Sequence, residues 1–199
     1  MKLVGITGGS GTGKSFVLRA LESHGALVLN ADEIYHELLR QNDALKAELE
    51  AEFLHAFCED GEVDRMILGE IVFNNPSALH TLETITHKYI ITEIEHRLMH
   101  WRASSEALAA IEAIALVESG FAQICDTIIG VTAPQERRIL RIMERDGISR
   151  ESAELRISCQ KPDSFYEENC DYLLENTYDS SDVFYVECVK FFDEIVTTH

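Results

Sequence analysis

The sequence predicts an α/β fold of three layers, in which helices cover both faces of a five-stranded parallel sheet. Short apolar runs alternate along the chain with segments of helical pattern, an order typical of such sheets. A glycine-rich loop joins the first apolar run to the first helical segment. The chain has 199 residues, of which 46% are hydrophobic, enough for one substantial core.

The first half of the chain is predicted to contain two strands and then a long helical stretch. Residues 2–7 and 26–29 are short apolar runs typical of buried parallel strands. Between them, the residues from Phe16 onward have helical character, which closes near Gly25. After the second strand we expect a helix over 33–57, a turn at 60–61, a helix over 64–73, a break at 74–76 and a long helix over 77–101.

The second half of the chain is predicted to supply the remaining strands. We expect strands at 111–117, 127–131 and 172–174, with helices over 135–145, 150–159 and 181–196. The helical stretch between the second and third strands is too long for one crossover. It is therefore predicted to be a substrate-binding insertion over about 33–107.

The loop Gly8-Gly9-Ser10-Gly11-Thr12-Gly13-Lys14-Ser15 fits the phosphate-binding pattern G-x-x-x-x-G-K-[ST]. Glycines allow successive backbone N–H groups to turn inward around an anion, and the following helix points its positive end at the same phosphates. We expect Lys14 to reach the β- and γ-phosphates of a nucleotide and the Ser15 hydroxyl to bind Mg²⁺. The alternative is an ordinary glycine-rich turn, but such a turn does not require Lys-Ser at its end.

Polar residues are expected to follow three strands, at the edge where parallel sheets bind ligands. These residues are Asp32, Glu118 and Thr132. The Asp32 carboxylate can accept a proton from an attacking hydroxyl or orient it, and can help to hold Mg²⁺ through water. The alternative for Asp32 is helix capping, because it precedes a helical pattern and is a favourable N-cap residue. The two roles are compatible. For Glu118 the choice is a metal-associated acid or a residue that begins a helix.

Arginines are concentrated in the predicted helix over 135–145, where Arg138, Arg141 and Arg145 share one face. Arginines stabilise the charge that spreads over a phosphoryl group during transfer. Beside the glycine-rich loop, this helix is therefore interpreted as part of a mobile lid that clamps phosphates. The alternative is a basic surface helix that pairs with carboxylates such as Glu144.

Composition argues against several classes of function. The formal net charge of −18 argues against a nucleic-acid partner, because phosphate contacts need a basic surface. The five cysteines are widely spaced and contain no C-x-x-C pair, which argues against a thiolate zinc site. No apolar run approaches about 18 residues, so no membrane span is expected. The odd cysteine count and the lack of a signal peptide favour reduced thiols and a cytoplasmic location.

Further motifs extend the pattern in order over nearly the whole chain. Residues 7–15 read Thr-Gly-Gly-x-Gly-x-Gly-Lys-Ser, and Asn30-Ala31-Asp32 follows the second strand. Later segments are 60–68 (D-G-x-[LV]-D-R-x-x-L), 72–73 (V-F), 82–87 (L-E-x-I-x-H), 141–146 (R-x-x-x-R-D), 156–160 (R-I-x-x-Q) and 170–176 (x-D-x-x-[IL]-x-N). With these motifs the chain resembles the dephospho-coenzyme A kinases, whereas generic P-loop kinases share only the first motif.

This resemblance implies a P-loop kinase fold and ATP-dependent phosphorylation of the ribose 3′-hydroxyl of dephospho-coenzyme A, the last step of coenzyme A synthesis. It implies a core of residues 1–32, 108–135 and 168–199, an insertion that binds the acceptor, and a small helical lid over about 136–167. The expected partners are these small molecules, with Mg²⁺, and the protein is expected to be a monomer or a weak homo-oligomer.

The resemblance also implies roles for single residues. Asp32 is then the base, and Lys14 and Arg141 stabilise the transferring phosphoryl group. The acceptor would be held by Asp32, Asp64, Arg65, His87 and Glu118, although a lone histidine in mid-helix, such as His87, is more often structural. Nucleotide-binding residues would be Gly8, Gly9, Gly11, Thr12, Gly13, Lys14, Ser15 and Phe16, with Arg145 in the lid and Asn176 near the adenine.

The chain departs from the family pattern at a few positions. Asn30 replaces the first Asp of the usual pair, which removes one charge near Mg²⁺, and Phe16 replaces a usual Thr. Lys88 replaces a proline, and residues 115–118 differ from the usual Pro-Leu-Leu-aromatic run before Glu. None of these changes removes a group assigned to chemistry. The alternatives are a P-loop kinase of another nucleoside, nucleotide or small alcohol, and a nucleotide-binding protein without catalysis.

Overall fold

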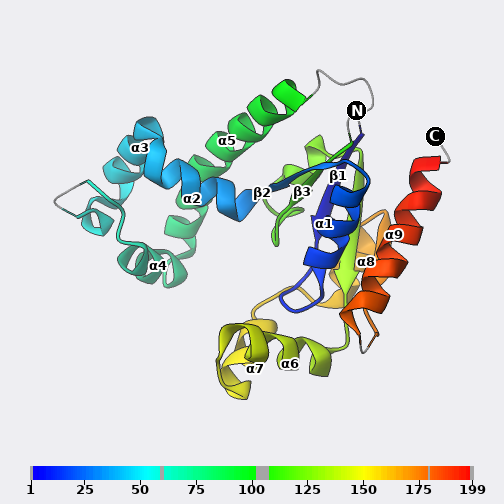
Figure 1. Cartoon of the computed structure of the whole chain (residues 1–199). Helices are drawn as coiled ribbons and strands as arrows, with labels where there is room; N and C mark the ends of the chain where they lie inside the picture. The colour runs from blue at the N-terminus through cyan, green and yellow to red at the C-terminus, as the bar shows by residue number, and fades with distance from the viewer. Residues whose placement is uncertain (1, 59–60, 102–107, 179, 198–199) are drawn as a thin grey trace. The chain divides into compact units, whose positions relative to one another are not determined.

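The computed structural model describes residues 2–58, 61–101, 108–178 and 180–197 (Figure 1). The chain divides into two compact units, a sheet unit of residues 1–29 and 101–199 and a helical unit of residues 30–100. The predicted turn residue Asp60 and the predicted end of the insertion at 107 lie outside the described residues. In the described part of the chain, no helix is both long and apolar enough to cross a membrane.

The sheet unit is built on a five-stranded parallel sheet, as predicted. Its strands are β1 (Lys2–Thr7), β2 (Leu27–Asn30), β3 (Leu108–Glu112), β4 (Thr127–Thr132) and β5 (Tyr172–Glu175), in the order β2-β3-β1-β4-β5. β1 is central and pairs in parallel with β3 and with β4; Val4 lies opposite Ala110 on one side and Thr127 on the other. The crossovers place the carboxyl ends of β1, β3 and β4 at one edge, where the phosphate-binding pattern begins.

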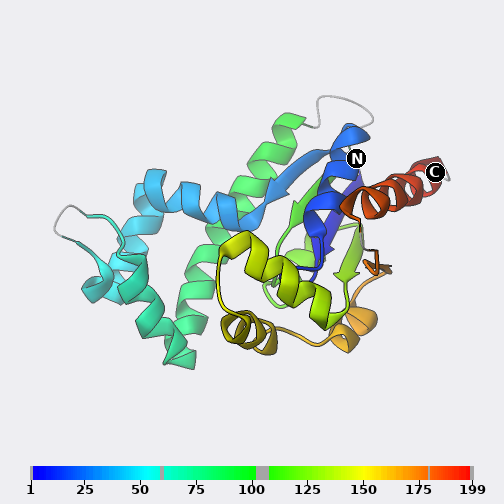
Figure 2. The same cartoon turned by 60° about the horizontal axis from the view of Figure 1, so that its bottom comes forward.

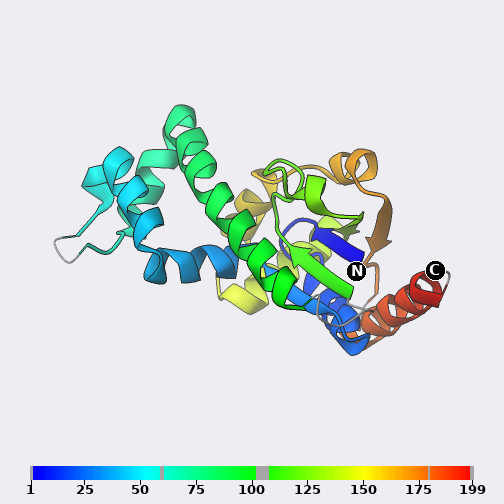
Figure 3. The ribbon, with the colours of Figure 1, turned by 90° about the horizontal axis from the view of Figure 1, so that it is seen from above.

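Helices cover both faces of the sheet. On one face α1 (Lys14–Ser23) and α9 (Ser181–Thr197) pack side by side (Figure 1), and their buried core includes Ile6, Val17, Leu21, Phe184 and Phe192. The 3-10 turn η2 (Phe121–Ile124) and α8 (Asp163–Asn169) contact β1 and β4 from the other face (Figure 3). Successive side chains of β1 and β4 point to opposite faces of the sheet, so each strand contributes to the core on both faces.

Two helices that pack on each other form a small satellite of the sheet unit (Figure 2). They are α6 (Gln135–Asp146) and α7 (Arg150–Ser158), with a buried contact of Ile139, Ile142 and Ala153. Gly147 ends α6 with a left-handed backbone, and Ser149 caps α7 by accepting the N–H of Ser152.

The helical unit contains α2 (Ala31–Gln41), α3 (Asp43–Phe53), the 3-10 turn η1 (Leu54–Ala56), α4 (Arg65–Phe73) and α5 (Pro76–Trp101). The single helix predicted over 33–57 was wrong, because Asn42 interrupts it. Asn42 has an extended backbone, and its side chain accepts the N–H of Leu45, so it ends α2 and caps α3. Arg97 of α5 donates to Glu37 of α2 at 2.5 Å, which ties the first and last helices of this unit together.

The third strand also differs from its prediction. It spans Leu108–Glu112 rather than 111–117. Ala109 and Ala110 are fully buried at its centre, but alanine is a weak strand former, so the pattern favoured the more apolar run that follows. That run forms turns, in which Leu116 is fully buried. The short helix α8 was not predicted, since seven residues carry little periodicity.

Candidate functional site

The phosphate loop, residues 8–15, connects β1 to α1 in the sheet unit. Gly8, Gly11 and Gly13 have φ angles of 142°, 77° and 106°, a backbone region that other residues rarely adopt. At Gly13 a Cβ would also lie 2.5 Å from Nδ2 of Asn176. Because α1 begins at Lys14, the positive end of its dipole lies at the loop. The loop therefore has the backbone of an anion site.

Consecutive carbonyl oxygens of the phosphate loop, from Gly8 to Thr12, all accept hydrogen bonds from side chains. The Gly9 oxygen accepts from Thr12 Oγ1 at 2.9 Å. This arrangement holds the negative ends of the peptide dipoles against cations and amides, away from a bound anion. The remaining donors are Lys14, Arg138, Arg141 and Asn176, at 2.8, 3.0, 3.1 and 2.9 Å from the oxygens of Gly8, Ser10, Gly11 and Thr12.

Lys14 lies beside a carboxylate that the sequence analysis missed. Its Nζ is 3.6 Å from Oε1 of Glu112, and both side chains are nearly buried. Glu112 is the last residue of β3, but the strand predicted at 111–117 placed it inside the strand. The expectation that Glu118 directly follows the third strand was wrong, because β3 ends at Glu112 and Glu118 lies in the turns after it, where it pairs with Lys161 at 3.9 Å. The carboxylate at the end of this strand is that of Glu112.

Arg141 and Asn176 meet at the phosphate loop. Arg141 donates from Nη2 to Oδ1 of Asn176 at 3.2 Å, and Asn176 is 1% exposed. Burial lowers the pKa of Arg141, and Arg137 lowers it further, but a guanidinium stays charged at neutral pH. Both ends of the Asn176 amide are used within the protein, so its side chain holds the loop in this structure.

Arg145 does not reach the phosphate loop in this structure, although it shares a helix with Arg138 and Arg141. It donates from Nε and Nη2 to the two carboxylate oxygens of Asp146, at 2.7 and 3.0 Å, and Arg156 donates to the same carboxylate. The hydrogen bond from Arg145, followed by that from Arg156, lowers the pKa of Asp146 to about 2. The predicted common face of three arginines is thus divided between the loop and this ion-pair cluster.

The first residues of α1 were predicted to bind Mg²⁺ and nucleotide. Ser15 is exposed at the second position of the helix. The rings of Phe16 and Phe184 pack edge to face, with their centroids 6.4 Å apart. Among the described residues, no group of three or more His, Cys, Asp and Glu could hold a metal ion. Mg²⁺ in nucleotide sites takes most of its ligands from phosphates and water, so a single hydroxyl fits this chemistry.

In the helical unit, Asp32 is exposed in the first turn of α2. The N-cap of this helix is Asn30, whose Oδ1 accepts the N–H of Glu33 at 3.0 Å. The capping role considered for Asp32 therefore falls to Asn30. This assignment also explains how the helix accommodates Asn at the position where the family pattern has Asp, since both residues cap well.

Arg65 and His36 form a contact that the sequence analysis did not predict. Arg65 donates from Nη2 to Nε2 of His36 at 3.2 Å, so the imidazole is neutral and its proton is on Nδ1. Burial lowers the pKa of His36, and Arg65 lowers it further. Asp64 caps α4 by accepting the N–H groups of Met66 and Ile67. His87 is half-buried in mid-α5, where burial lowers its pKa.

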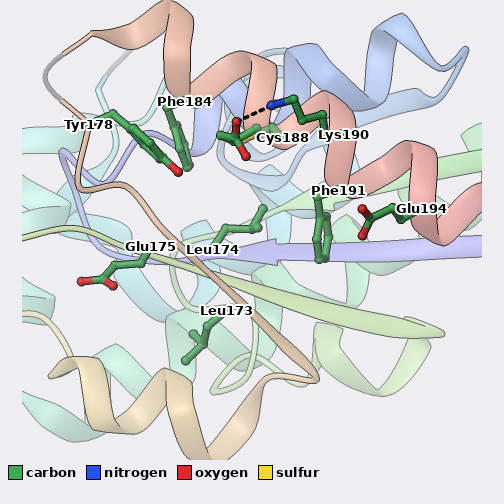
Figure 4. A pocket seen from close by; sticks show the side chains of 10 residues that line it. Leu173, Leu174, Glu175, Tyr178, Phe184, Cys188, Lys190, Phe191 and Glu194 are labelled. Atoms are coloured by element: carbon green, nitrogen blue, oxygen red, sulfur yellow. Dashed lines mark hydrogen bonds and ion pairs between the residues drawn. The ribbon is translucent and has the colours of Figure 1, made fainter.

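A pocket of about 340 Å³ lies between β5 and α9 (Figure 4). Leu173, Leu174 and Phe191 give it apolar walls, and Glu175 and Glu194 are among its carboxylates. None of the residues that line it was predicted to bind nucleotide, metal or acceptor. The pocket adjoins the phosphate loop, because a Cβ placed on Gly13 would lie 3.3 Å from the ring of Phe184, which lines it.

Comparison with known proteins shows similarity over nearly the whole chain. The family model for dephospho-CoA kinase matches residues 2–182. A dephospho-CoA kinase from Dehalococcoides mccartyi is 39% identical over 165 residues, which cover 82% of this chain and 83% of that protein. A crystal structure from Thermus thermophilus superposes with a TM-score of 0.80 at 30% identity, over 96% of this chain and 97% of that one. A dephospho-CoA kinase structure from Campylobacter jejuni gives 0.70 at 30% identity, over 100% and 99%.

Proposed function

The chain belongs to the dephospho-CoA kinase family, and from this premise we propose that it transfers the γ-phosphoryl group of ATP to the ribose 3′-hydroxyl of dephospho-coenzyme A. The family match over residues 2–182 carries the proposal, because it takes in the phosphate loop, α6, α7 and the helical unit together. The product is coenzyme A, and the reaction is the final step of its synthesis.

In the proposed reaction, the ribose 3′-oxygen forms a bond to the γ-phosphorus while the bond from that phosphorus to the β–γ bridging oxygen breaks. ADP leaves, and Asp32 accepts the hydroxyl proton. The position of Asp32 supports this role, because it is exposed and Asn30 already caps its helix. An exposed carboxylate without a capping role is available to a substrate hydroxyl.

Lys14 and Arg141 are assigned to the phosphates. Lys14 neutralises the β- and γ-phosphates, and Arg141 stabilises the charge on the transferring group. These two assignments are supported by the contacts of Lys14 and Arg141 with carbonyl oxygens of the phosphate loop. Arg145 remains a predicted nucleotide contact, which requires its bonds to Asp146 to open.

Mg²⁺, when bound to ATP, neutralises part of the phosphate charge. Ser15 is the residue assigned to hold it, since its hydroxyl is exposed next to Lys14. For the acceptor we assign Arg65, whose guanidinium suits a phosphate group, with Asp64, His87 and Glu118 as further predicted contacts. Asn176 is assigned to the adenine end of the site. It acts there through the phosphate loop, because its side chain donates to the Thr12 oxygen.

A coupled kinase assay tests the proposed function. Purified protein is mixed with MgATP and dephospho-coenzyme A, ADP is followed, and the product is identified by mass and by its sensitivity to a 3′-nucleotidase. We expect ADP formation that depends on both the acceptor and Mg²⁺. Transfer to a different nucleoside, nucleotide or alcohol in a parallel acceptor panel would contradict the assignment, as would ATP binding without transfer to any acceptor.

A further inference from the structure

We propose that Gln160 is a positioning residue for ATP, and that its side chain acts by holding Ser10 of the phosphate loop in place. The inference deepens the proposed function, because it concerns how the ATP site is held in shape. Gln160 comes one residue after the C-cap of α7, and its own N–H donates to the oxygen of Ile157 at 3.0 Å. It is therefore anchored to a helix that is distant from the loop in sequence.

The Gln160 amide makes a two-point contact with one loop residue. Its Oε1 accepts the backbone N–H of Ser10 at 2.9 Å, and its Nε2 donates to Ser10 Oγ at 2.8 Å. Arg138 donates from Nη2 to the same Oε1 at 2.7 Å. Turning the amide over would place its NH₂ group against two donors, so its orientation is determined by its partners.

Arg138 completes the clamp by holding the peptide on the other side of Ser10. Its Nε donates to the Ser10 oxygen at 3.0 Å, and the residue is 5% exposed. Both the N–H and the C=O of Ser10 are thereby held from outside the loop. Burial of the guanidinium makes this contact rigid, because Arg138 has little room for another rotamer.

Gly9 supplies an independent observation for the clamp. A Cβ at this position would lie 2.2 Å from Arg138 Nη2 and 2.8 Å from Gln160 Oε1. Gly9 is not among the glycines with a positive φ, so its backbone does not require glycine. The space above it is occupied by the two clamping side chains, and this explains the glycine at position 9 in terms of packing.

The clamp lies between two glycines with left-handed backbones, Gly8 and Gly11. Their oxygens accept hydrogen bonds from side chains, so the clamp adds to the contacts that hold the loop. A phosphate site performs best when its N–H groups are already in place, since ordering them during binding costs affinity. Gln160 therefore acts on ATP affinity and not on proton transfer.

The test is titration calorimetry of MgATP without any acceptor. Gln160→Met keeps the shape of the side chain and removes the amide, and Gln123→Met is the matched control at an exposed glutamine of η2. We expect Gln160→Met to weaken MgATP binding by about tenfold, the loss of one or two hydrogen bonds to the loop, and the control to bind like the parent. Equal affinity of Gln160→Met and the control would overturn the proposal.

Two further variants keep the test decisive if Gln160→Met unfolds. Gln160→Glu retains an acceptor for the Ser10 N–H but cannot donate to Ser10 Oγ, so it should bind MgATP more weakly than the parent. Gly9→Ala should displace the two clamping side chains and should also weaken MgATP binding; parent-like affinity of both variants would overturn the proposal. Because no acceptor is present, these outcomes do not depend on whether dephospho-coenzyme A is the substrate, which the coupled assay decides separately.

Discussion

Asn176, in the segment after β5, accepts a 3.2 Å hydrogen bond from Arg141 of α6. The other end of the Asn176 amide donates to the Thr12 oxygen at 2.9 Å. One buried side chain thus joins three segments that are far apart in the sequence. The phosphate loop is held at this end by an amide and at the Ser10 end by the clamp of Gln160 and Arg138.

Asn176→Asp should weaken both the fold and ATP binding. A carboxylate cannot donate to the Thr12 oxygen, so two acceptors would face each other in a buried place. We expect the free energy of unfolding to fall by about 1–3 kcal/mol, and the KM for ATP to rise. Urea denaturation and steady-state kinetics measure the two effects. Asn169→Asp, an exposed change on α8, is the control, and equal stability of the two variants would contradict the prediction.

Lys14→Met should remove much of the transition-state stabilisation. We expect kcat/KM to fall by about 10²–10³-fold, as is typical when a group that stabilises the negative charge of the transition state is removed. Glu112→Gln should cost ~10-fold or less, because Lys14 keeps its bond to the Gly8 oxygen. Lys46→Met, which breaks an ion pair with Glu62 in the helical unit, serves as the control. A loss in Glu112→Gln as large as in Lys14→Met would show that Glu112 itself takes part in transfer.

Asp32→Asn should separate chemistry from binding. The amide keeps the size of the side chain but cannot accept the hydroxyl proton, so kcat should fall by about 10²–10⁴-fold. The dissociation constant of MgATP should stay within about twofold of the parent value, because the phosphate-loop contacts are unchanged. Glu33→Gln, the next residue of the same exposed turn, is the control. Near-normal turnover of Asp32→Asn would rule out Asp32 as the base.

Because of His36, the free energy of unfolding should depend on pH in the mildly acidic range. Burial, followed by Arg65 and Arg40, lowers the pKa of His36 below its ordinary value of 6.5, against the opposing charge of Asp32. The unfolded chain therefore binds more protons between the lowered pKa and 6.5. This contribution to stability is complete above about pH 6.5 and is lost as the pH falls through that window.

The measurement is the free energy of unfolding in urea at several values between about pH 5 and pH 8. His36→Gln still offers an acceptor to Arg65 but does not titrate, so its profile should decline less on the acid side. His87 contributes in the same direction as His36, whereas His24, whose pKa is raised, opposes it. His80→Gln, an exposed change on α5, is the control. Parallel profiles for His36→Gln and the parent would contradict the prediction.

The fold class and the phosphate loop could be predicted because their signals are local. A buried strand, a run of glycines and Lys-Ser lie within a few residues of each other, and each has few alternative structures. Glu112 was missed because Ala109 and Ala110 weaken the strand signal that precedes it. The contacts of Gln160 and His36 join segments distant in sequence, and periodicity carries no information about such pairs. Asn42 looked like an ordinary helix residue because a cap is recognised by its backbone angles, not by its type alone.

Asn30→Asp should distinguish a capping role of Asn30 from an effect on the metal. Asp caps a helix as well as Asn, so the free energy of unfolding should change by less than about 0.5 kcal/mol. Asn30→Ala loses the bond to the Glu33 N–H and should cost about 1 kcal/mol. If the residue also acts on Mg²⁺, Asn30→Asp should lower the Mg²⁺ concentration needed for half-maximal rate, because it restores a carboxylate. An unchanged Mg²⁺ requirement, together with the loss of stability in Asn30→Ala, would make Asn30 a cap alone.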